Sequence, residues 1–196
     1  ISISLVPFNG QVNLGPDLRA KYTALTADPN NAGVSPAVTN VNCVDMPSDV
    51  YTTTGIATSK PMSMTANADT YSSTYKTTSY LAPTDTSYAI GYHTQYNALN
   101  VWCPPLANNI LRLPSSTTAT LQSYINGLSA VGATSINAGF KWGLTMLDPT
   151  LRTAFTQFRG TGKMAQSTIG RPFDYTDKEA MKIVVLMTDG EHFAQE

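Results

Sequence analysis

The clearest hydrophobic feature of the chain is a short apolar run, Ile183 to Met187, which leads into Thr188-Asp189-Gly190. A continuous run of this length, rich in β-branched residues and closed by Asp-Gly, predicts a fully buried strand of a parallel sheet. Ligands of open α/β sheets collect at the carboxyl ends of the strands, where Asp189 would lie. Taken alone, an Asp-Gly pair is more often a plain turn.

Alternation and helical spacing predict further elements. Ile1 to Leu5 alternate in the manner of a strand that Pro7 ends. Ser115 or Ser116 can cap a helix that ends near Gly132. Its apolar positions recur one turn apart, at Leu121, Tyr124, Ile125 and Leu128.

A small-residue loop, Gly132 to Gly139, leads into the next predicted helix, which Asp148-Pro149 ends. One face of that helix carries Ile136, Phe140, Gly143, Leu144 and Leu147. A shorter helix is predicted over Leu151 to Phe158.

Between Gly10 and Ala107 the chain is rich in Thr, Ser, Asn and Tyr, and it has no helical stripe. It is too long for a simple loop, and its composition favours short strands and hairpins. The best candidate strands are Ser87 to Tyr92 and Leu99 to Cys103. Its recurring tyrosines suit either a small core or an exposed recognition face: Tyr71, Tyr75, Tyr80, Tyr88, Tyr92 and Tyr96.

The order of strand, long insertion, two helices and strand predicts an α/β layered sheet. Residues 1–9 and 108–196 would form its core, and residues 10–107 would be an insertion with β-hairpins. The chain opens without Met, within a strand, and it ends soon after Asp189. We therefore expect a piece of a longer protein, incomplete at both ends.

The charge pattern narrows the function classes. Twelve Lys and Arg residues balance thirteen Asp and Glu residues, and no basic stripe is present, which argues against a nucleic-acid or anionic-membrane surface. Charged residues make up only 13% of the chain, a balance that suits an extracytoplasmic protein. No apolar stretch is long enough to span a membrane.

Cys43 and Cys103 are too far apart for a CxxC redox motif or a zinc knuckle. The exported composition favours a disulfide between them, and the alternative is two unrelated buried thiols in a reducing compartment.

Thr134 and Asp189 are the candidate metal ligands. Thr134 precedes a helix and Asp189 follows a strand, so both would lie at the same rim of an open α/β sheet. A hydroxyl and a carboxylate there suit Mg²⁺, which takes oxygen ligands and retains several waters. Taken singly, Thr134 is better explained as a helix N-cap.

The pair and its surroundings resemble the von Willebrand factor A domain with its metal-ion-dependent adhesion site. Closer still, the chain is similar to the A domains of TadG-like proteins of the tight-adherence (Flp) pilus system. The resemblance covers roughly Ile1 to Asn13 and Ser115 to His192. It rests on LVPF at Leu5 to Phe8, on GATSINAGFKWGLTMLDP from Gly132 and on KIVVLMTDGEH from Lys182.

The resemblance implies a Rossmann-like A-type fold in which Thr134 binds Mg²⁺ directly and Asp189 holds it through water. The family's Asp-x-Ser-x-Ser motif is absent, because Asp85-Thr86-Ser87-Tyr88-Ala89 lacks the last serine and lies in the insertion. We expect that motif upstream of Ile1, in a membrane-anchored full-length protein. Thr134 and Asp189 alone would not bind the metal tightly.

The expected function is non-enzymatic: adhesion or pilus assembly through metal-dependent contacts with a protein partner, such as a pilus or surface component. The alternative is a structural assembly module with a vestigial metal site, whose insertion makes the contacts. Enzyme readings have little support, because neither His93 nor His192 neighbours a Gly-x-Ser-x-Gly elbow or an activated cysteine. Glu191 and His192 are better explained as a polar loop beside the site. A metal-dependent hydrolase is the least favoured hypothesis.

Overall fold

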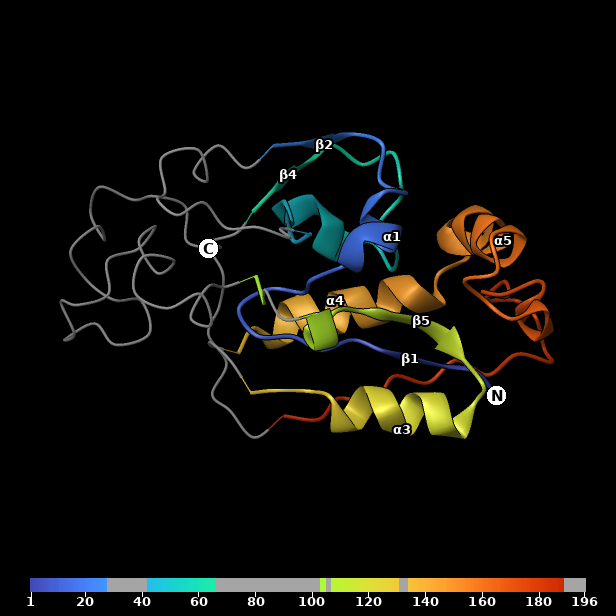
Figure 1. Ribbon diagram of the computed structural model, residues 1–196. Coiled ribbons are helices and arrows are strands. Elements are labelled where there is room, and N and C mark those ends of the chain that lie inside the picture. The colour runs from blue at the N-terminus through green and yellow to red at the C-terminus, as the bar shows by residue number, and fades with distance from the viewer. Residues whose placement is uncertain (28–41, 66–102, 105–106, 131–133, 189–196) are drawn as a thin grey trace, which may run out of the picture.

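The computed structural model describes residues 1–27, 42–65, 103–104, 107–130 and 134–188, and it shows a mixed α/β protein (Figure 1). The predicted α/β class is therefore confirmed. Within these residues the strands form two separate small sheets, one of two strands and one of three.

The first sheet pairs β1 (Ile3–Leu5) with β5 (Arg112–Ser115) in antiparallel orientation. Ile3 lies opposite Ser115, and Leu5 lies opposite Arg112. The predicted N-terminal strand is thus confirmed, although it is shorter than its alternating pattern. Helix α3 (Thr118–Asn126) and helix α4 (Ile136–Leu147) both contact β1.

The second sheet is formed by segments that flank the undescribed part of the insertion. Its order is β2 (Leu25–Thr26), β4 (Met62–Met64) and β3 (Val44–Asp45), with β2 parallel and β3 antiparallel to β4. Helix α1 (Gly15–Arg19) precedes it, and a 3₁₀ turn (Ser48–Thr52) follows β3.

The disulfide that the composition favoured is present between Cys43 and Cys103, with an S–S distance of 2.09 Å. Both cysteines are buried. The candidate strand Ser87 to Tyr92, nearly all of Leu99 to Cys103, and the recurring tyrosines lie outside the described residues.

The end of α4 matches the sequence prediction, because the helix stops before Asp148-Pro149, but the predicted face does not: Trp142 and Met146 are buried and Phe140 is exposed. Helix α3 is shorter than predicted: its N-cap is Thr117 instead of Ser115 or Ser116, and it ends at Gly127. A 3₁₀ turn (Pro149–Leu151) leads into α5 (Arg152–Gly160), close to the predicted third helix. Short 3₁₀ turns also occur at Ala107–Asn109 and Gln166–Thr168.

One hydrophobic core joins α4 and α5 to the described part of the insertion. Trp142 of α4 is fully buried, and its ring meets Tyr22 edge to face at 5.6 Å between centroids. Leu14 and Leu18 come from α1 and its N-cap, while Phe155 and Phe158 come from α5. The division into residues 1–9 with 108–196 and residues 10–107 stays a prediction.

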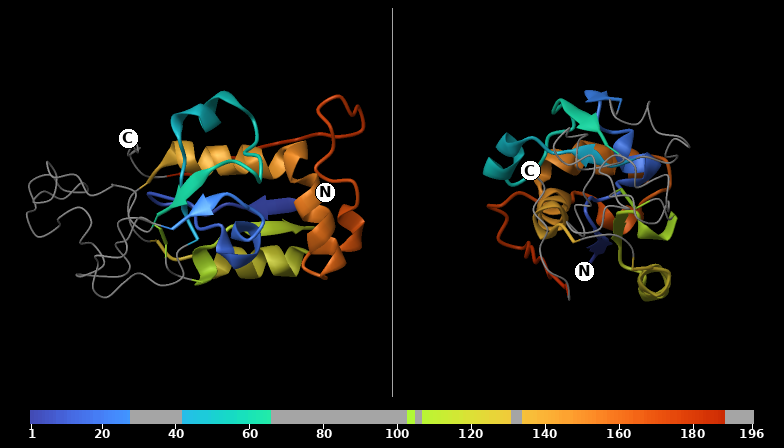
Figure 2. Two further views of the ribbon diagram at one scale, coloured as in Figure 1. Left: turned by 90° about the horizontal axis from the view of Figure 1, so that it is seen from above. Right: turned by 90° about the vertical axis from the view of Figure 1, so that its left-hand side faces the viewer.

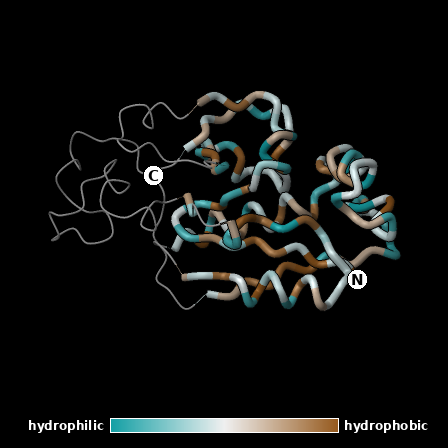
Figure 3. The backbone as a smooth tube through the Cα atoms, viewed as in Figure 1, coloured by the Kyte–Doolittle hydropathy of each residue, from teal (hydrophilic) through white to brown (hydrophobic). Residues whose placement is uncertain are grey.

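The C-terminal apolar run departs from its prediction. Ile183 to Met187 form no strand, and Ile183, Val185 and Met187 are exposed. The run lies alongside α4, on the opposite side of β1 from β5 (Figure 2). Its hydrophobic colour in Figure 3 contrasts with this exposure. The prediction of a buried strand is wrong here because a strand requires a hydrogen-bonding neighbour, and none is provided by the described residues.

Candidate metal-binding rim at the start of helix α4

Thr134 lies immediately before the first turn of α4 and is half-buried. The N-cap of α4 is Ser135, whose hydroxyl contacts the Asn137 side-chain oxygen at 2.5 Å and makes no capping hydrogen bond to the helix. The Asn137 oxygen also accepts the Ala138 N–H at 2.9 Å. Thr134 is therefore not the cap, and its hydroxyl has no hydrogen-bond partner among the residues that the structure describes.

The turn after β1 holds this loop in place. The Ser135 N–H donates to the Asn9 carbonyl oxygen at 2.6 Å, and the Asn9 side-chain oxygen accepts the Gln11 N–H at 2.9 Å. Phe8 packs against Gly139, where an added Cβ would lie 2.4 Å from a ring carbon. The carboxyl end of β1 and the Thr134 loop thus form one rim, and that Asp189 belongs to it stays a prediction.

The C-terminal segment ends at the same end of the molecule. Residues 182–188 run in the same direction as β1, toward the end at which α4 begins (Figure 1). Thr188 is the last described residue, so Asp189 lies outside the described structure together with Glu191 and His192. The Thr134 loop and the described end of the C-terminal segment therefore lie at the same end of the molecule.

Thr134 could supply one of the oxygen ligands that a hard cation needs. A threonine hydroxyl without a hydrogen-bond partner can be a ligand of Mg²⁺, which prefers oxygen. Among the described residues, no group of three or more His, Cys, Asp or Glu side chains could hold a metal ion. Any cation at this rim would therefore take most of its ligands from water or from residues outside the described part.

A second polar cluster, which the sequence analysis missed, lies at the other end of α4. Asp148 is a buried residue, 6% exposed, and its carboxylate accepts hydrogen bonds from the Thr150 N–H at 2.9 Å and the Tyr175 hydroxyl at 2.8 Å. The Lys182 ammonium lies over the Tyr175 ring, 3.8 Å from its centroid. Asp148-Pro149 indicated only a helix end in the sequence, because its partners come from distant segments.

These contacts shift the proton affinities of the cluster. Burial alone would raise the pKa of Asp148, but the hydrogen bonds from Thr150 and Tyr175 and the charge of Lys182 outweigh it, so this pKa is lowered. Desolvation and the Asp148 hydrogen bond raise the pKa of Tyr175 to about 12. Desolvation lowers the pKa of Lys182, although Asp148 and Asp174 oppose this effect.

A pocket of about 500 Å³ opens beside Asp148. Two of its lining residues, Thr53 and Thr54, are tied to α4, because the Lys141 ammonium donates to their carbonyl oxygens, to that of Thr54 at 3.0 Å. Gly55 approaches so closely that an added Cβ would lie 2.4 Å from the Asp148 carboxyl carbon. The polar groups of Lys141 and Asp148 bond mainly to other groups of the protein. The cluster is therefore best explained as a structural contact that holds the loop of residues 53–57 against α4.

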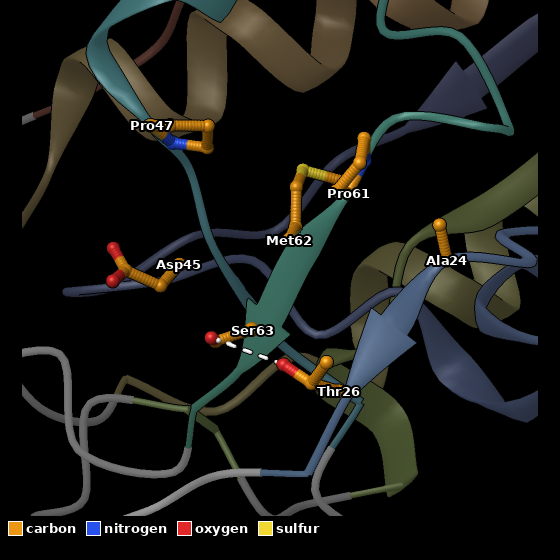
Figure 4. A pocket seen from close by; sticks show the side chains of 7 residues that line it. All are labelled: Ala24, Thr26, Asp45, Pro47, Pro61, Met62 and Ser63. Atoms are coloured by element: carbon orange, nitrogen blue, oxygen red, sulfur yellow. Dashed lines mark hydrogen bonds between the residues drawn. The ribbon is translucent and has the colours of Figure 1, made fainter.

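A shallower pocket of about 330 Å³ lies on the three-stranded sheet (Figure 4). The Thr26 and Ser63 hydroxyls in its wall hydrogen-bond to each other at 3.2 Å. Among the described residues that line it, Asp45 is the only charged one, and Met62 and two prolines supply apolar surface. This composition does not indicate a particular ligand.

Comparison with known proteins yields no relatives: no family model, no curated protein and no solved structure matches the chain. None of the described helices is both long and apolar enough to cross a membrane.

Proposed function

We propose that this chain belongs to an extracytoplasmic adhesion or pilus-assembly protein that makes metal-dependent contacts with a protein partner. The contact surface is the rim formed by the Thr134 loop and the segment that ends at Asp189. The proposal rests on the resemblance to the A domains of TadG-like proteins.

The main structural support for the proposal is the position and hydrogen bonding of Thr134. The main structural explanation for this residue was an N-cap, and Ser135 occupies that position instead. Within the described part of the chain, the Thr134 hydroxyl has no hydrogen-bond partner, and its loop lies at the end of the molecule where β1 and residues 182–188 also end. A hydroxyl that binds a metal ion must lie at the rim and must have an oxygen lone pair that no hydrogen bond occupies.

Thr134 would hold Mg²⁺ through its hydroxyl, and Asp189 would hold it through water. The cation would supply an open coordination position for a carboxylate of the partner. The remaining ligands would come from outside this chain. The disulfide between Cys43 and Cys103 supports an oxidising compartment, where such bonds persist.

Binding of the full-length protein to purified tight-adherence pili tests the proposal, with Mg²⁺ or with EDTA. We expect EDTA and Thr134→Ala each to weaken binding at least about tenfold, which is the loss of about 1.4 kcal/mol. Thr134→Ser keeps the hydroxyl and should retain most of the binding. Equal binding with and without EDTA would contradict the metal-mediated contact.

A structural module with a vestigial site is the second candidate. It would keep the same fold, and the insertion would make the subunit contacts. If the double variant Thr134→Ala and Asp189→Ala bound pili as well as the wild type, this candidate would replace the first.

A further inference from the structure

We draw no further inference here: the strongest candidate, the buried side-chain amide of Gln11, whose oxygen and nitrogen have no hydrogen-bond partner among the residues that the structure describes, lies in the turn after β1 that is hydrogen-bonded to the Thr134 loop, so it belongs to the site already described, and nothing in the structure shows what binds it.

Discussion

Asp148 is the residue for which the structure gives the clearest pH dependence. Its pKa is lower in the fold than the usual 3.8, mainly because the hydrogen bonds from Thr150 and Tyr175 outweigh the effect of burial. The folded protein therefore binds this proton less readily than the unfolded chain does. Asp148 stabilises the fold above the unfolded pKa, and this contribution is lost as the pH falls through the folded pKa.

We expect Asp148→Asn to lower the free energy of unfolding by about 1–3 kcal/mol at neutral pH, because the Thr150 N–H and the Tyr175 hydroxyl lose a charged acceptor that is itself buried. The difference from the wild type should shrink in acid, below the unfolded pKa. Urea denaturation at both pH values measures it. Asp174→Asn is the control: its ion pair with Arg152 is largely exposed and should contribute less than about 1 kcal/mol. A cost for Asp148→Asn that stayed constant with pH would exclude the charge as its cause.

Individual residues of the two polar sites show what can and cannot be predicted from the sequence. The Thr134 loop was identified from its sequence, but Ser135 was not chosen as the N-cap because adjacent hydroxyl residues are equivalent in a capping pattern. The Asp148 cluster was missed for a different reason. Tyr175 and Lys182 approach Asp148 only after the chain folds back along α4, and no local pattern encodes that approach.

At the scale of elements, α4 was predictable because its signals are local. Helical periodicity and the Asp148-Pro149 stop give its bounds without reference to the rest of the fold. The run Ile183–Met187 was not, because a strand exists only through its neighbour. Its apolar composition indicates a segment that favours burial, but the described residues supply no second strand beside it.

Two glycines of α4 provide a matched test of how closely the helix approaches its neighbours. An added Cβ would lie 2.4 Å from the Phe8 ring at Gly139 but 3.7 Å from Val184 at Gly143. We expect Gly139→Ala to lower the free energy of unfolding by about 1–3 kcal/mol, since the ring must move. Gly143→Ala should be neutral or raise it by up to about 1 kcal/mol, since alanine favours the helix.

Chemical denaturation of the two variants measures this difference directly. Both substitutions have the same chemistry on the same helix, so helix propensity cancels between them. Equal stabilities would contradict the close contact of Phe8 with α4, and with it the placement of the end of β1 beside the Thr134 loop.

For the whole molecule, the disulfide links two distant parts of the insertion. Cys43 and Cys103 are separated by 60 positions, and both are buried. Cys43 directly precedes Val44 of β3, which belongs to the same core as Trp142 of α4. The bond therefore holds the two ends of the segment 43–103 of the insertion together beside the main core.

We expect the double variant Cys43→Ala and Cys103→Ala to lower the free energy of unfolding by about 4 kcal/mol, because the unfolded chain regains the entropy of an open loop of this length. Denaturation of the wild type with and without dithiothreitol should show a loss of similar size, and the double variant should not respond to the reductant. If reduction left the wild type unchanged, the bond would not support the fold, and the argument for an oxidising compartment would lose its structural basis. A loss of the expected size would mean that a reducing compartment removes about a quarter or more of the stability of an ordinary domain. The protein would then be adapted to the cell exterior or periplasm.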